Sequence, residues 1–188
     1  MTGAWPTLIV LVAAGLAIAA VALDTVIAGA PPMPLMPAAR DVVVRLLAAR
    51  AKGPVYDLGA GWGGVAFDLA RRRPDLTVVA VERAVLPLVV LWLRRLVTRR
   101  RNLTVLWADV HRLDLKFAGG LYAYLNRPAM KRLAARLRHT APAGIPVVSA
   151  GFTLPGWTPE RILPVPASLL SPEVFLYRVP GLRDTDAV

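Results

Sequence analysis

One ten-residue stretch constrains the fold of this chain more than any other. Residues 55–64 read Val-Tyr-Asp-Leu-Gly-Ala-Gly-Trp-Gly-Gly, a short apolar strand that runs into a glycine-rich turn. Glycines adopt positive φ angles and let the backbone approach a ligand that a Cβ would block. A helix is predicted from about Gly63 to Arg72, and its first N–H groups and positive dipole end lie beside the same turn. The pattern predicts an α/β domain with a site for a nucleoside-like cofactor.

The glycine spacing satisfies two cofactor motifs. Gly59, Gly61 and Gly64 fit G-x-G-x-x-G, the dinucleotide pattern, which is weak by itself. Gly59, Gly61 and Gly63 behind Asp57 also fit D-x-G-x-G-x-G, the first motif of S-adenosylmethionine (SAM) methyltransferases. A carboxylate two residues before the first glycine suits a cofactor with a cationic amino acid end better than it suits a pyrophosphate. We therefore favour SAM as the cofactor and keep an NAD-dependent enzyme as an alternative.

Two further acids end predicted strands. The apolar runs at residues 77–81 and 103–108 are expected to be strands, and they end at Glu82 and Asp109. Ligands in open α/β sheets bind outside the carboxyl ends of the strands. We expect Glu82 to bind the ribose hydroxyls and Asp109 to accept a hydrogen bond from the adenine amino group, so that both complete the cofactor site with Asp57.

The rest of the chain continues the alternation of helices and strands. Apolar spacing predicts helices over 41–51, from about Ala84 onward and over 129–138, and strands over 121–125, 145–150 and 173–179.

With these motifs in place, the chain resembles the seven-strand (class I) SAM-dependent protein lysine methyltransferases of archaeal and mitochondrial type. The resemblance includes the membrane-anchored branch that acts on ATP synthase subunit c and the adenine nucleotide carrier, and it covers residues 32–179. It rests on the proline-containing loop at 34–37, on residues 121–130 and on the Phe-Thr-Leu-Pro-Gly-Trp-Thr-Pro segment at 152–159. The resemblance implies a Rossmann-like seven-stranded sheet with helices on both faces, preceded by one N-terminal transmembrane helix.

The chain also departs from the family pattern. Trp62 and Gly64 stand where family members commonly carry Asp and Arg, and Ala38 stands where a hydroxyl residue is usual.

The resemblance also implies roles for individual residues. Pro37 belongs to the loop that closes over SAM. Asn126, at the end of the fourth strand, faces the methyl group and orients the acceptor amine through its side-chain oxygen, and the turn at Pro128 holds that geometry. Tyr124 and Trp157 are candidate walls of a lysine channel, where an aromatic face stabilises a methylated ammonium.

The N-terminus carries a second signal. Residues 5–23 hold no charge and are almost wholly apolar, and as a helix they span about 28 Å, close to the hydrocarbon thickness of a bilayer. We predict a transmembrane anchor over 1–30, a proline-rich linker and cofactor-closing loop over 31–40, the methyltransferase domain over 41–180 and a flexible tail over 181–188. A cleaved signal peptide or a transit peptide fits less well because no Lys or Arg precedes the apolar run. A buried core helix is disfavoured by the length of the uncharged run.

Basic residues predict the orientation and a partner. All Lys and Arg residues follow residue 39, so the positive-inside rule places the C-terminal domain on the cytoplasmic side of the membrane. Arg94, Arg95 and the run at 99–101 gather around the end of a predicted helix. Beside an anchor, we expect these side chains to attract anionic lipid headgroups. Nucleic acid binding is the weaker interpretation of the net charge of +11.

The sequence favours a membrane-anchored, SAM-dependent methyltransferase that modifies a lysine of a protein at or in the membrane. A lipid or quinone methyltransferase and a non-catalytic SAM-binding membrane protein remain alternatives. The absence of cysteine excludes disulfides and thiolate metal sites. His111 and His139 have no partner at ligand spacing, so no metal site is expected.

Overall fold

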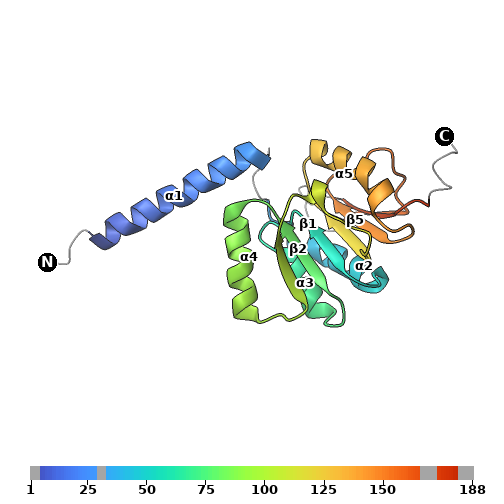
Figure 1. The fold of residues 1–188 in the computed structure, drawn as a ribbon, viewed down its shortest axis with the longest axis horizontal. Helices are drawn as coiled ribbons and strands as arrows, with labels where there is room; N and C mark the ends of the chain where they lie inside the picture. The colour runs from blue at the N-terminus through green and yellow to red at the C-terminus, as the bar shows by residue number, and fades with distance from the viewer. Residues whose placement is uncertain (1–4, 29–32, 166–172, 182–188) are drawn as a thin grey trace.

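The computed structural model describes residues 5–28, 33–165 and 173–181, and the predicted tail therefore lies outside it apart from Gly181. Strands and helices alternate through most of this part of the chain (Figure 1). The helices are α1 (Trp5–Ala28), α2 (Pro37–Arg50), α3 (Gly64–Arg72), α4 (Val85–Thr98), the 3-10 turn η1 (Val110–Arg112) and α5 (Arg127–Thr140). The strands are β1 (Val55–Leu58), β2 (Val78–Glu82), β3 (Leu103–Trp107), β4 (Gly120–Ala123), β5 (Pro146–Ala150), β6 (Arg161–Leu163) and β7 (Val174–Arg178).

The described strands form one seven-stranded sheet in the order β3-β2-β1-β4-β5-β7-β6. The strands from β3 to β5 pair in parallel, and β7 pairs antiparallel with both β5 and β6. Along the chain, the strands begin with β1 in the middle of the sheet, continue outward to β3 and then return to β4 on the other side of β1. The strand order therefore reverses between β1 and β4, which is the position where open α/β sheets bind ligands. The predicted seven-stranded Rossmann-like sheet is confirmed.

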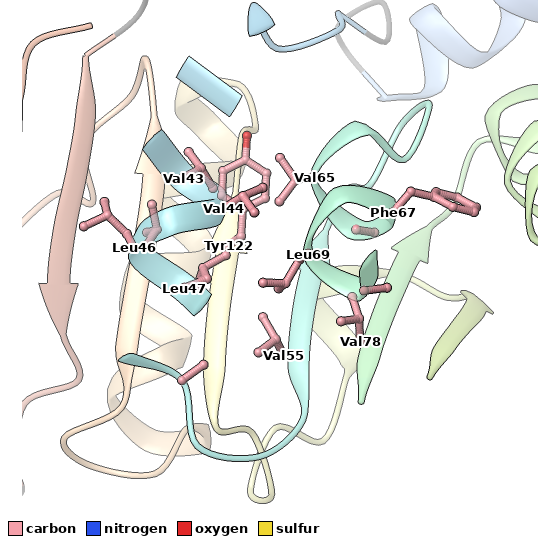
Figure 2. Close-up of a cluster of buried hydrophobic side chains, with 14 of the residues drawn as sticks. Val43, Val44, Leu46, Leu47, Val55, Val65, Phe67, Leu69, Val78 and Tyr122 are labelled. Carbon is pink, nitrogen blue, oxygen red and sulfur yellow. The ribbon is translucent and has the colours of Figure 1, made fainter. Parts of the chain in front are cut away.

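Alternating side chains fill a core on each face of the sheet. In β1, Val55 packs with α2 and α3, whereas Leu58 packs with η1 and α5 on the opposite face. Figure 2 shows the first of these cores, in which Leu47 of α2 and Leu69 of α3 pack over the sheet near Val55. Leu91 of α4 belongs to the same core, so α2, α3 and α4 cover one face. Helices on both faces were predicted, and they are present.

The predicted strands agree with the observed ones to within two residues. The largest difference is in β4, which ends at Ala123, so that Tyr124 and Leu125 lie beyond it and Asn126 caps α5 instead of ending a strand. Strand β6 was not predicted. It is three residues long and largely exposed, and it pairs only with β7, so its sequence carries little of the apolar alternation that predicts a strand.

The predicted anchor coincides with helix α1, which extends away from the sheet and contacts α4 (Figure 1). Several of its apolar side chains are exposed, among them Trp5, Ile9 and Ile18. Among the described residues, no helix is both long and apolar enough to cross a membrane, so the predicted transmembrane helix is not supported by the structure.

Candidate functional site

A cavity of about 410 Å³ lies at the carboxyl ends of β1, β2 and β4. Its size is typical of small-molecule sites. The linker before α2, the glycine turn after β1 and the segment after β4 all contribute to its wall. Asp57, Gly59, Gly61 and Glu82 line it, as predicted for the cofactor side, and Tyr124 and Asn126 line it as predicted for the acceptor side.

The glycine turn has the backbone geometry that its sequence predicts. Gly59, Gly61 and Gly63 all have positive φ angles, and Gly63 is the N-cap of α3. Gly61 faces open space, because a Cβ at this position would meet no atom within 4 Å. Gly63 instead lies against Leu91 and Phe67, which a Cβ would approach to 2.4 and 2.8 Å. Gly61 therefore belongs to the cavity, and Gly63 to the packing that supports it.

Asp57 is a buried carboxyl group with one oxygen lacking a partner. Its Oδ2 accepts a hydrogen bond from the N–H of Ala66 in α3 at 3.0 Å, and Oδ1 has no partner among the described residues. Burial raises the pKa of Asp57 to about 7, since desolvation outweighs the bond from Ala66 and the negative charge of Glu82 adds to the rise. A cationic group in the cavity would offset that desolvation.

Tyr122 is a cavity residue that the sequence did not predict. It pairs with Asp57 in the register of β4 and β1, so both side chains lie on the same face of the sheet. Figure 2 shows its ring beside α2 and α3, near Val43, Val44 and Val65, which belong to the same buried cluster. The hydroxyl is buried without a partner in the described part of the chain, and burial raises its pKa well above the usual value. Only the strand register, which the sequence leaves undefined, brings Tyr122 beside Asp57.

Glu82 is held in place by the backbone around it. Its Oε2 accepts from the N–H of Gly61 at 2.8 Å, and its Oε1 accepts from the N–H groups of Arg83 and Ala84. A carboxylate has about four acceptor positions, so Glu82 keeps capacity for a ligand hydroxyl. The same bonds tie the glycine turn to the end of β2.

Two other predicted cofactor residues do not line the cavity. The Asp109 carboxylate caps η1 by accepting from the N–H of His111 at 2.9 Å, and it lies 3.9 Å from a guanidinium nitrogen of Arg83. Pro37 is the first residue of α2, and the wall is formed instead by Pro34 and Leu35 just before it. Their predicted contacts with the cofactor remain predictions.

The part of the cavity wall that is predicted to bind the methyl acceptor is aromatic. Tyr124 and Phe152 stack with ring centroids 6.3 Å apart, and both line the cavity beside Asn126. The Asn126 side-chain oxygen accepts from the N–H of Ala129 at 3.0 Å and so caps α5. This helix has Pro128 in its first turn, a position that proline tolerates.

Trp157 lies elsewhere. Its indole N–H donates to the Ala134 carbonyl of α5, and its ring meets Tyr177 edge-on at 6.3 Å, in the core on the opposite face of the sheet. It is not among the residues that line the cavity. In the described residues, His, Asp and Glu side chains form no group able to hold a metal ion.

Two arginines enter the cavity wall from helices. Arg40 of α2 pairs with Asp68 at 2.9 Å, and its side chain covers Gly64, where a Cβ would lie 3.1 Å from Arg40 Cδ. Arg94 of α4 donates to the carbonyl oxygen of Trp62 and stacks over the ring of Phe67. Arginine is therefore present at the glycine turn, although the turn itself contains none. The sequence carried no signal for either contact, because both depend on how the helices pack.

The residues of the cavity fit SAM. The Asp57 Oδ1 and the Tyr122 hydroxyl, which have no partner among the described residues, suit the polar amino acid end of the cofactor, and Glu82 suits the ribose. The open face of Gly61 leaves room for close approach. A seven-stranded sheet with an antiparallel β7 and a cofactor site at its reversal point defines a class I methyltransferase.

Comparison with known proteins identifies the family. The model of the ANTKMT methyltransferase domain matches residues 57–161, so the chain belongs to this family. It is a SAM-dependent methyltransferase with SAM as its cofactor. No curated protein sequence matches the chain.

Solved structures share the fold at low sequence identity. An RNA methyltransferase from Salinibacter ruber, in complex with S-adenosyl-L-homocysteine, is 20% identical with a TM-score of 0.67, covering 79% of this chain and 95% of its own. The putative methyltransferase yhhF from Escherichia coli is 13% identical with a TM-score of 0.65, covering 79% and 88%. A SAM-dependent O-methyltransferase from Thermotoga maritima is 12% identical with a TM-score of 0.61, covering 79% and 68%.

Proposed function

We propose that this protein transfers a methyl group from SAM to a lysine side chain of a protein at a membrane. The match to the ANTKMT family is the observation that carries the proposal, because it connects the fold to protein lysine methylation. The geometry of the acceptor side supports it. Tyr124 and Phe152 form an aromatic part of the cavity wall, which suits the apolar stem of a lysine side chain.

The cavity residues supply placement and desolvation. Bound SAM supplies an electrophilic methyl group on a sulfonium. Asp57 and Tyr122 hold the amino acid end, Glu82 holds the ribose, and the glycine turn provides a surface without side chains. An acceptor amine must be neutral to attack, and the apolar wall favours its neutral form by desolvation. Methyl transfer of this kind depends on orientation more than on acid–base groups.

Asn126 is the candidate for orienting the amine. It lines the cavity beside Tyr124, and its cap on α5 fixes the side chain in one position. A fixed amide at the cavity wall directs a neutral amine without adding a charge that would keep the amine protonated. The aromatic faces of Tyr124 and Phe152 then tolerate the methylated ammonium product.

We also propose that the protein acts at the cytoplasmic face of a membrane. The apolar run at residues 5–23 supports contact with a membrane, and the basic residues that all follow residue 39 favour the cytoplasmic leaflet because its lipids are anionic. The exposed apolar side chains of α1 support it too, because water is an unfavourable surrounding for Trp5, Ile9 and Ile18. A short linker after α1 would keep the cavity close to the bilayer.

The direct test is transfer of labelled methyl from SAM into membranes of a strain that lacks this gene. The products are separated into protein and lipid, and Asp57→Ala serves as the inactive control, with thermal unfolding to check that it folds. A discrete labelled protein band that is absent with the control supports the proposal. Hydrolysis of that band should give methylated lysine. Label confined to lipid supports a lipid or quinone methyltransferase instead, and saturable SAM binding without transfer supports a non-catalytic protein.

A further inference from the structure

Helix α4 presents an apolar stripe to solvent. Its buried residues, Pro87, Leu88 and Leu91, face the sheet. The exposed residues recur at intervals of three and four positions and therefore share another face of the helix. They are Val85, Val89, Trp92, Leu93, Leu96 and Val97. The exposed fraction reaches 73% at Leu96 and 81% at Val97.

The stripe has no cover in the described part of the molecule. These side chains remain exposed although α1 contacts α4, and Figure 1 shows α1 approaching only one end of that helix. Single exposed apolar residues are ordinary, but a continuous row of them marks an interaction surface. Trp107 on the neighbouring edge strand β3 is also 64% exposed.

Positive charge adjoins one end of the stripe. Arg99, Arg100 and Arg101 follow α4 directly, and none of them forms an ion pair with a carboxylate in the described residues. The helix itself contains no Asp or Glu. The other two arginines of the predicted cluster are engaged within the domain, Arg94 with Trp62 and Arg95 with the carbonyl oxygen of Leu103.

We propose that the α4 stripe lies in the interface of an anionic lipid bilayer, as a membrane contact separate from α1. Amphipathic helices with aromatic and aliphatic residues on one face and basic residues beside it bind anionic membranes in this way. Charge complementarity favours lipid headgroups as the occupant, and α1, which also exposes apolar side chains, contacts α4. Tryptophan is enriched at the level of the headgroups, which suits Trp92.

Docking through α4 would place the catalytic cavity at the membrane surface. Ala84, the N-cap of α4, and Arg94 within it both line the cavity, so the helix that contacts lipid also forms part of the site. This inference concerns how the domain meets the bilayer, and it holds whichever acceptor is methylated.

The absence of cysteine allows a direct test. Single variants Leu93→Cys and Val97→Cys of the full chain are labelled with an environment-sensitive fluorophore and reconstituted into vesicles of phosphatidylcholine and phosphatidylglycerol. Lys131→Cys, at an exposed position of α5 on the opposite face of the sheet, is the matched control. If α1 alone binds the vesicle, it brings position 131 to the membrane as well, so only a contact of α4 with lipid distinguishes the positions. We expect blue-shifted emission at positions 93 and 97 and at least twofold stronger quenching there by lipids with a doxyl group near the headgroup than at position 131.

Two outcomes would overturn the proposal. Quenching at positions 93 and 97 no stronger than at position 131 would show that α4 stays out of the lipid. A blue shift without quenching would show that protein covers the stripe instead, from this chain or another copy.

A separate control tests whether the contact of α4 with the bilayer needs anionic lipid. The variant for this control combines Arg99→Gln, Arg100→Gln and Arg101→Gln in the Val97→Cys background. Binding of S-adenosylhomocysteine (SAH) verifies that the variant folds. We expect quenching at position 97 to fall at least twofold with this variant, and also for the parent in vesicles of phosphatidylcholine alone. Quenching that is equal in neutral and anionic vesicles would refute the role of anionic lipid.

Discussion

At the scale of single residues, Asp57 predicts a pH dependence of cofactor binding. Because burial raises the pKa of Asp57 to about 7, this carboxyl is largely protonated below pH 7 in the cofactor-free protein. A cationic amino group favours the ionised carboxylate, so binding releases a proton below pH 7. The affinity for S-adenosylhomocysteine (SAH) should therefore increase from pH 5.5 to pH 7, by up to about tenfold per unit. Calorimetric titration over this range measures it.

The variant Asp57→Asn provides the control for this titration. Its amide oxygen can still accept the hydrogen bond from Ala66, but the side chain does not titrate. The affinity should be lower and almost constant with pH, and a parent protein with equally constant affinity would contradict the role of Asp57.

The raised pKa of Asp57 also predicts how the stability of the cofactor-free protein depends on pH. The folded-state pKa lies above the ordinary value of 3.8, so the folded protein binds more protons between about pH 4 and pH 7. The free energy of unfolding contributed by Asp57 should therefore decrease as pH rises through this window.

Two glycines of the turn predict opposite consequences of the same substitution. Both have positive φ, which costs an alanine about 1 kcal/mol or more. Gly63→Ala adds a clash with Leu91 and Phe67, and overpacking of this kind costs about 1–3 kcal/mol more. Gly61→Ala meets no protein atom but enters the cavity wall. We expect Gly63→Ala to lower the Tm more, and Gly61→Ala to weaken SAH binding more. Thermal unfolding and SAH titration compare the two, and equal effects in both measurements would count against this division.

At the scale of elements, the start of α5 combines a structural and a functional prediction. Asn126→Ala removes the cap and should cost about 1 kcal/mol of stability, whereas Asn126→Asp keeps a capping oxygen. If Asn126 orients the amine, both variants should lower kcat at least tenfold, because the aspartate charge would keep the acceptor lysine protonated. The Tm should fall only for alanine. Full activity of Asn126→Asp would restrict Asn126 to its capping role.

The elements themselves were largely predictable, because four of the five parallel strands, β1, β2, β4 and β5, are mostly buried and appear as apolar runs. The helix beginning near Ala84 shows where this reasoning ends. Apolar residues lie both on its buried face and on its exposed face, so periodicity could not separate the residues that face the sheet from the stripe that faces solvent. Only packing against β2 and β3 makes that distinction. Strand β6 was not predicted because it is short and largely exposed, so its sequence contains too few apolar residues to indicate a strand.

At the scale of the whole molecule, the site draws on segments that lie far apart in the chain. The rule that ligands bind at the carboxyl ends of parallel strands predicted Asp57 and Glu82 as cofactor residues, and both line the cavity. The same rule placed Asp109 at the end of β3, but β3 is the edge strand, and the cavity lies nearer the centre of the sheet. Trp157 shows a related limit, because the sequence does not reveal which face of the sheet a loop residue will join.

Because the cavity joins the linker, β1, β2 and β4, a ligand that fills it should stabilise the domain as a unit. At a concentration of SAH one hundred times its Kd, mass action adds about 2.7 kcal/mol to the free energy of unfolding. For a domain of this size, the Tm should rise by about 5–10 °C. Methylthioadenosine lacks the amino acid end and leaves Asp57 and Tyr122 without a partner, so at equal concentration it should raise the Tm less. Thermal unfolding followed by tryptophan fluorescence measures both shifts. A larger shift with NADH than with SAH would refute the cofactor assignment, and equal shifts with SAH and methylthioadenosine would remove Asp57 and Tyr122 from the binding site.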